Sequence, residues 1–217
     1  MLIDKLTFDY GTPLYRDFSL DIPDHAITAI LGGSGTGKST LLHLLAGLLT
    51  PKGGQVPKVE CSYMFQTPRL LPTLTVLGNV QAVLPKGQKD KAKEWLEQAE
   101  MGDYLKYYPH ELSGGMATRV ALARAFAVEK DVLLMDEPFT GLDMALSERL
   151  KGVFSSFWQA NKPTTLLVTH DPDLALSVCH QVVVLGGKPV ETVYLSEVDD
   201  SGRDRVLSEV KQALLTL

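Results

Sequence analysis

The chain has 217 residues, a formal net charge of −5 and 45% hydrophobic residues. These values are typical of a folded globular protein and argue against extended disorder and against nucleic-acid binding driven by overall positive charge. The best apolar run, Leu41–Leu49, is too short to span a bilayer, and no secretory signal is visible at the N-terminus. Cys61 and Cys179 are too few for a disulfide scaffold, so we expect free, buried thiols in a reducing compartment.

Predicted strands lie near the N-terminus, and further predicted strands alternate with helices along the rest of the chain. Apolar residues that alternate with polar ones around Leu6 and from Phe18 to Ile22 predict a small N-terminal antiparallel sheet. Continuous apolar runs predict buried strands, and these runs are Ile27–Leu31, Val132–Met135, Thr165–Val168 and Val182–Leu185. Because helical patterns separate these runs, we expect an α/β fold with a mainly parallel central sheet and helices on both faces.

The helical patterns indicate a single domain that spans residues 1–217. The predicted helices are Lys38–Leu48, Lys89–Glu100, Gly114–Val128, Ala145–Ala160, Asp173–Cys179 and Arg203–Leu217. Residues from about 67 to 110 are interrupted by prolines and show no obvious strand, so we interpret them as an inserted helical subdomain. Four lysines between residues 86 and 93 predict a solvated helix face, with contact to anionic lipid headgroups as the alternative.

A glycine-rich loop joins the Ile27–Leu31 strand to the following helix and matches the phosphate-loop pattern G-x-x-x-x-G-K-S. Glycines let consecutive backbone N–H groups converge on a polyphosphate, and the helix N-terminus adds donors and a partial positive charge. Lys38 can reach the β- and γ-phosphates, and the Ser39 hydroxyl can bind Mg²⁺. The predicted nucleotide-binding residues of this loop are Gly32, Gly33, Ser34, Gly35, Thr36, Gly37, Lys38, Ser39 and Thr40.

Polar side chains follow three other apolar runs. Asp136 and Glu137 end the Val132–Met135 strand, where Asp136 can approach Mg²⁺ and Glu137 can act as general base toward a water molecule. His170 follows the Thr165–Val168 strand, and a structural role for it is as reasonable as a catalytic one. Gln66 can orient water and contact Mg²⁺, although a single glutamine carries little information.

The segment Leu112-Ser113-Gly114-Gly115-Met116 is a serine-capped helix start with two glycines. Together with the phosphate loop, Gln66, the Asp136–Glu137 pair and His170, in this order, it makes the chain resemble the ATP-binding cassette (ABC) ATPases over essentially its whole length. The resemblance implies a P-loop NTPase fold. The sequences of these motifs are most similar to those of bacterial importer ATPases of the nitrate, sulfonate and taurine type.

The resemblance also implies roles for individual residues. Tyr10 looks like the aromatic residue that stacks on adenine, with Tyr15 as a substitute. Lys38, Gln66, Glu137 and His170 are the implied catalytic set, and Ser39, Gln66 and Asp136 are the implied Mg²⁺ ligands. The signature residues and the D-loop aspartate, which would contact nucleotide from a second copy, are Ser113, Gly114, Gly115, Met116 and Asp143.

The implied assembly has several chains. Two cassettes would pair head to tail as a homodimer, with ATP at the interface. Residues 67–110 would dock on an integral membrane permease. A solute-binding protein would act through the permease, and no nucleic acid would be bound. We therefore expect a cytoplasmic subunit, peripheral on the cytoplasmic face of the inner membrane, that hydrolyses ATP to drive solute import.

Three departures from the family pattern bear on this interpretation. Thr118 stands where related importers often carry glutamine, Leu174 stands where an acidic residue is common, and the chain between Lys38 and Gln66 is short. The short segment predicts a trimmed antiparallel hairpin. The alternative functions are a non-transport ABC ATPase in DNA repair or translation, and a regulatory module that dimerises on ATP without turnover.

Overall fold

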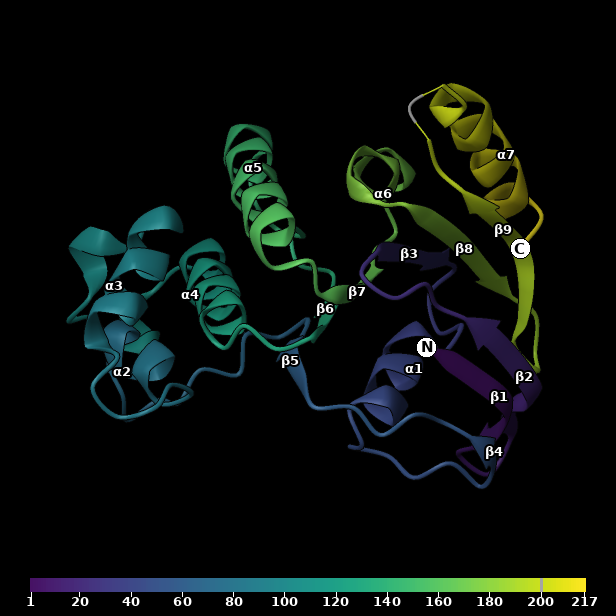
Figure 1. The fold of residues 1–217 in the computed structure, drawn as a ribbon, viewed down its shortest axis with the longest axis horizontal. Helices are drawn as coiled ribbons and strands as arrows, with labels where there is room; N and C mark the ends of the chain where they lie inside the picture. Colours follow the sequence, from purple (N-terminus) through teal and green to yellow (C-terminus); the bar gives the residue numbers. More distant parts are fainter. Residues whose placement is uncertain (200) are drawn as a thin grey trace. The chain divides into compact units, whose positions relative to one another are not determined.

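The computed structural model describes residues 1–199 and 201–217 (Figure 1). Its internal contacts divide the chain into two compact units. Unit 1 comprises Met1–Cys61 and Pro163–Leu217, and unit 2 comprises Ser62–Lys162. Each unit holds a different part of the predicted site, so the two are described separately.

Unit 1 contains the expected N-terminal antiparallel sheet. Its strands are β1 (Leu2–Asp9), β2 (Pro13–Asp21) and β4 (Gly53–Gln55), in the order β2-β1-β4. Both neighbours run antiparallel to β1. Leu6 and Phe8 of β1, and Phe18 and Leu20 of β2, are buried in alternation with more exposed residues, as the sequence predicts. The alternation does not extend along the whole strands, and the register of β1 with β2 shifts between Ile3 and Leu6. β4 has only three residues, in keeping with the short segment between the phosphate loop and Gln66.

The second sheet of unit 1 has the strand order β7-β3-β8-β9. These strands are β3 (Ile27–Gly32), β7 (Thr164–Val168), β8 (Gln181–Gly186) and β9 (Glu191–Glu197). β3 runs parallel to β7 and β8, and every residue of these three strands is buried. β9 pairs antiparallel with β8 and was not predicted, because its mostly exposed residues form no apolar run.

Three helices complete unit 1: α1 (Lys38–Leu45), α6 (Pro172–Val178) and α7 (Arg203–Leu215). The sequence pattern predicts that α1 continues to Leu48, but the helix stops earlier because Gly47 adopts a left-handed φ of 68°. Val206 and Val210 form the buried stripe of α7. Lys211 on α7 pairs with Asp173 on α6 at 3.0 Å.

Unit 2 is mainly helical. Strands β5 (Cys61–Met64) and β6 (Val132–Asp136) are neighbours in one sheet. The helices are α2 (Val76–Gln81), α3 (Lys89–Gln98), η1 (Gly102–Tyr104), η2 (Pro109–Glu111), α4 (Gly114–Ala127) and α5 (Met144–Asn161). Residues 67–110, all of which the structure describes, contain helices and turns and no strand. Apolar side chains of α2, α3 and α4 share one core that includes Val80, Leu96 and Val120.

The lysines of the α3 region differ in their surroundings. Lys86 and Lys89 are exposed, whereas Lys91 pairs with Glu129 at 2.7 Å. Both cysteines are free thiols. Cys179 is buried, and desolvation raises its pKa to about 12, while Cys61 is half-buried and its pKa is raised for the same reason.

The structure also bears on membrane insertion. In residues 1–199 and 201–217, no helix has both the length and the apolar composition that crossing a bilayer requires.

Candidate functional site

The phosphate loop of unit 1 lies between the last residue of β3 and the first residue of α1, as the motif predicts. Gly32 has a φ of 150°, and a Cβ on it would lie 2.4 Å from the carbonyl oxygen of Leu185 on β8. Gly35 and Gly37 also have positive φ values, of 74° and 93°. Because L-residues with side chains adopt such conformations only with strain, the loop requires glycine at these positions.

The N-terminus of α1 carries no side-chain cap, since its capping position is Gly37. Its first backbone N–H groups are thus not taken up by a capping side chain, and together with the helix dipole they favour an anion. The Lys38 ammonium donates to the carbonyl oxygens of Gly32 and Gly33, both at 2.9 Å. The lysine is therefore held over the loop on which a phosphate would sit.

A hollow of about 320 Å³ opens beside this loop and is lined by Tyr10, Leu14 and residues 35–40. The Tyr10 side chain is 65% exposed, its ring packs edge-on against Phe8, and its hydroxyl lies 3.4 Å from Thr40 Oγ1. An exposed ring at the edge of a phosphate site can stack on a nucleotide base.

Tyr15 has a different role from Tyr10. It is fully buried, and its hydroxyl donates to the carbonyl oxygen of Gly37 at 3.0 Å. Burial raises the pKa of Tyr15 above its ordinary value. Tyr15 therefore supports the phosphate loop through this hydrogen bond. Its buried ring has no face that a nucleotide base could reach, so it does not fit the role of substitute for Tyr10 in stacking on adenine.

His170 lies at the same edge of the sheet as the phosphate loop. β7 is parallel to β3 with Val168 opposite Ile30, so the residues that follow the two strands emerge side by side. The Thr169 amide donates to the carbonyl oxygen of Ile30 at 3.2 Å, and His170 itself is exposed. Leu174 is buried in unit 1, which shows why an apolar residue suits that position.

Unit 2 holds the acidic pair and Gln66. Asp136 ends β6 and is only 4% exposed. Glu137 follows with a φ of 51°, and its carboxylate accepts a hydrogen bond from Thr140 Oγ1 at 2.9 Å. Non-glycine residues adopt this left-handed conformation infrequently, because the Cβ atom crowds the backbone there. Gln66 is exposed just beyond β5, the strand that neighbours β6.

The signature segment of unit 2 begins α4. The Ser113 hydroxyl accepts a hydrogen bond from the Met116 amide at 3.3 Å, and Ser113 and Gly114 are exposed. A Cβ on Gly115 would lie 3.4 Å from Leu142 Cδ2, so the start of α4 packs against the turn that precedes α5.

Asp143 caps α5 at the end of that turn. Its carboxylate accepts from the Leu146 amide at 2.9 Å. The structure thus brings the signature segment and the turn leading to Asp143 together within unit 2.

A group of charged residues beside α4 has no signal in the sequence. Arg119 on α4 donates to the carbonyl oxygen of Glu100 at 3.0 Å, and the Glu100 carboxylate accepts from Arg149 Nε at 2.6 Å. The hydrogen bond from Arg149 lowers the pKa of Glu100. No sequence signal marks these contacts because their partners are far apart along the chain. Thr118 donates to the Gly114 carbonyl at 3.0 Å, within α4 itself.

The donor set of the predicted metal site suits Mg²⁺. Ser39, Gln66 and Asp136 offer a hydroxyl, an amide oxygen and a carboxylate, which are the hard oxygen ligands that Mg²⁺ prefers. In the part of the chain that the structure describes, no three His, Cys, Asp or Glu side chains cluster as in an all-protein metal cage.

Known proteins resemble this chain along most of its length. A family model described as ABC transporter matches residues 15–140. The aliphatic sulfonates import ATP-binding protein SsuB of Bacillus cereus is 40% identical over 185 residues, which cover 80% of this chain and 73% of the relative. The corresponding protein SsuB 2 of Frankia alni is 39% identical over 213 residues, which cover 96% and 86%.

A solved structure agrees with these relatives. It is the dimeric post-hydrolysis state of the ATP-binding cassette MJ0796 bound to ADP and Pi, with a TM-score of 0.82 and 25% identity, covering 92% of this chain and 99% of that one. The predicted fold class, the resemblance to importer-type ABC ATPases and the assignment as an ATP-hydrolysing enzyme are confirmed. The chain belongs to the ABC transporter family, as an ATP-binding and ATP-hydrolysing subunit.

Proposed function

We propose that this ATPase drives import of a small anionic solute, of the aliphatic sulfonate class, through a separate membrane permease. The relatives named above are import ATP-binding proteins for aliphatic sulfonates, and they cover most of the chain. The observation that carries the ATPase part of the proposal is the phosphate loop, where the glycine backbone, the uncapped α1 and Lys38 converge.

In the proposed mechanism, unit 1 binds the nucleotide. The backbone N–H groups of the loop and the Lys38 ammonium hold the phosphates, and Tyr10 stacks on the adenine. Tyr15 keeps the loop in place through Gly37. His170, which emerges beside the loop, contacts the γ-phosphate.

Glu137 is the proposed general base that takes a proton from the attacking water. The hydrogen bond from Thr140 orients its carboxylate. Gln66 orients the water. Ser39, Gln66 and Asp136 would hold Mg²⁺, which neutralises charge on the phosphate oxygens when bound.

A second copy of the chain completes the proposed site. The exposed start of α4, with Ser113 and Gly114, would meet the γ-phosphate of the nucleotide held by the partner copy, and Met116 and Asp143 would support this contact. The dimeric state of the cassette named above supports this proposal. Loss of the γ-phosphate removes negative charge from the interface and thereby favours its opening.

We place the subunit on the cytoplasmic face of the membrane, where ATP is available. Residues 67–110 are the proposed contact with the permease, since this segment begins immediately after Gln66. Leu71 is 48% exposed, whereas Leu70 packs against the core of unit 2, so Leu71 is the better candidate for a direct contact. A solute-binding protein would act through the permease.

The general-base assignment is tested with Glu137→Gln. We expect phosphate release to fall by ~10²–10⁴-fold, because the amide cannot accept the proton. ATP-dependent dimerisation, measured by gel filtration, should persist. The matched control is Glu94→Gln on α3, an exposed glutamate that should leave the rate unchanged. Wild-type hydrolysis by the Glu137 variant would refute the assignment.

The transport assignment is tested separately with the native membrane complex. We expect the tagged chain to co-purify with an integral membrane permease, and its deletion to abolish uptake of radiolabelled alkanesulfonate. Purification with nucleic acid and without a permease would contradict the proposal.

A further inference from the structure

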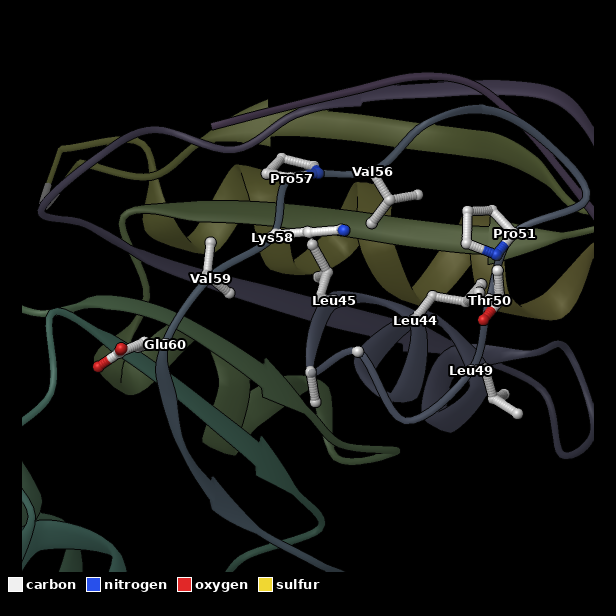
Figure 2. A pocket seen from close by; sticks show the side chains of 12 residues that line it. Leu44, Leu45, Leu49, Thr50, Pro51, Val56, Pro57, Lys58, Val59 and Glu60 are labelled. Carbon is white, nitrogen blue, oxygen red and sulfur yellow. The ribbon is translucent and has the colours of Figure 1, made fainter.

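A second cavity in unit 1 lies apart from the phosphate loop (Figure 2). It has a volume of about 610 Å³ and is formed by the C-terminal turn of α1, the residues after it, and the segment between β4 and β5. The nucleotide hollow is lined by different residues. The function proposed above therefore leaves this cavity without a role.

The walls of this cavity are mainly apolar. Leu44 and Leu45 come from α1, Leu49 follows the helix, and Val56 and Val59 come from the segment that leads to β5. Figure 2 shows Val56 on the side of the cavity that faces Leu44 and Leu45. A volume of this size with apolar walls and few polar groups is typical of sites for small organic ligands.

The cavity has one cationic side chain, Lys58. In Figure 2 its ammonium is directed across the cavity above Leu45, whereas the carboxylate of Glu60 points away from this group. Lys58 is exposed, and within residues 1–199 and 201–217 its ammonium makes no hydrogen bond and no ion pair. By contrast, the neighbouring Lys52 is paired with Asp9 at 2.6 Å. The charge of Lys58 is therefore available for an anion.

We propose that this cavity binds a small organic anion with an alkyl chain. The anionic head, a sulfonate or a carboxylate, would pair with the Lys58 ammonium, and the chain would lie against Leu44, Leu45 and Val56. Burial of each CH₂ group contributes about 0.8 kcal/mol, so affinity depends on chain length as well as on charge. The site goes beyond ATP hydrolysis and does not depend on the transport assignment.

The cavity is connected to the phosphate loop through α1. The first residues of this helix, Lys38 and Ser39, belong to the loop, and its last two, Leu44 and Leu45, line the cavity. At 1.5 Å per residue the two ends are only about 12 Å apart. A helix moves as a rigid element, so a ligand that shifts its last turn also shifts the phosphate-binding turn. Occupancy of the cavity is thus linked to nucleotide affinity.

The binding proposal is tested by isothermal titration of the full chain with octanesulfonate, below the concentration at which it forms micelles. We expect saturable binding that is lost with methanesulfonate, which lacks the chain, and with octylammonium, which has the opposite charge. Equal binding of octylammonium would overturn the proposal, because the cation at Lys58 would then have no role.

Two variants locate the site. Lys58→Gln should weaken octanesulfonate binding about tenfold or more, and the control Lys188→Gln, which removes an exposed charge in the turn between β8 and β9, should not. Val56→Trp should block binding by filling the cavity. Thermal unfolding midpoints show whether the variants are folded. Unchanged affinity in folded Lys58→Gln and Val56→Trp would overturn the proposal.

Two further measurements distinguish a free anion from a lipid headgroup and test whether the cavity is coupled to nucleotide binding through α1. Co-sedimentation with phosphatidylglycerol vesicles in the absence of octanesulfonate binding would point to a lipid surface and overturn the proposal of a free ligand. Saturating octanesulfonate should change the affinity for a fluorescent ATP analogue about fivefold or more. An unchanged affinity would overturn the link.

Discussion

Two helices of this protein start at glycine-rich turns, but only one of them has a side chain that accepts a hydrogen bond from its first backbone N–H groups. α1 follows Gly37 and has no capping side chain, whereas α4 follows Ser113, whose hydroxyl accepts from the Met116 amide. The start of α1 leaves donors for a ligand. The start of α4 already satisfies one of its own donors, and it is exposed on the surface of unit 2.

The supports of the two turns differ as well. The α1 turn rests on the core of unit 1, with Gly32 against the carbonyl of Leu185 and Gly37 held by Tyr15. The α4 turn is held by its own cap and by the packing of Gly115 against Leu142 in the turn that precedes α5. The phosphate-loop turn is thus fixed by contacts in the buried core of unit 1. The signature turn combines a local cap with a half-buried packing contact and suits an interaction that forms with a partner.

Gly32→Ala tests the packed support and should have the largest effect. The new Cβ would meet the Leu185 carbonyl oxygen at 2.4 Å, in a backbone conformation that strains any side chain. We expect a loss of about 3 kcal/mol in the free energy of unfolding and weaker ATP binding. Urea denaturation and nucleotide titration measure the two effects.

Gly35→Ala is the matched control for this prediction. Gly35 also has a positive φ, but a Cβ there meets no atom within 4 Å. We expect only the conformational penalty, about 1 kcal/mol. Equal effects of the two substitutions would mean that the contact with β8 is unimportant.

Tyr15→Phe tests the hydrogen bond that holds Gly37 in the phosphate loop and should have an intermediate effect. It removes the hydroxyl that donates to the Gly37 carbonyl at 3.0 Å and leaves the buried ring in place. We expect unfolding to become easier by about 1 kcal/mol, with a modest loss of ATP affinity. In the control Tyr10→Phe, the exposed ring is retained and both quantities should stay close to wild type. Identical behaviour of the two variants would contradict the different roles given to these tyrosines.

Ser113→Ala tests the cap of α4 and should have a smaller effect on stability. The cap is exposed and its hydrogen bond is long, so we expect a loss of about 0.5 kcal/mol in the free energy of unfolding. ATP-dependent dimerisation should weaken more than nucleotide binding by the monomer. Ser113→Thr, which keeps a hydroxyl, should restore both. If Ser113→Ala weakened monomeric ATP binding as much as Gly32→Ala, the comparison would fail.

The contact between Glu100 and Arg149 should have the smallest effect, because both side chains are largely exposed. A double-mutant cycle with Glu100→Gln and Arg149→Gln should give a coupling energy that disappears in high salt. Since the pair lowers the pKa of Glu100 from 4.5, its contribution is present above that pH and is lost as the pH falls below it. Coupling that persists in acid and high salt would show a contact stronger than its exposure allows.

Much of unit 1 was predictable because its signals are local. The buried strands β3, β7 and β8 are continuous apolar runs, and the glycine pattern marks the turn between β3 and α1. β9 was missed because an exposed edge strand is specified by pairing with β8 rather than by its own residues. The early end of α1 depends on the left-handed conformation of Gly47, which the apolar run through Leu48 conceals.

The sequence by itself determined the family, the fold class and the candidate residues, because ordered motifs on known element types carry that information. Tertiary structure decided which tyrosine supports the loop and which can reach a base, since burial depends on neighbours distant in the chain. It also decided the contact of Gly32 with Leu185 and the cavity around Lys58, because both are formed by segments that only folding brings together.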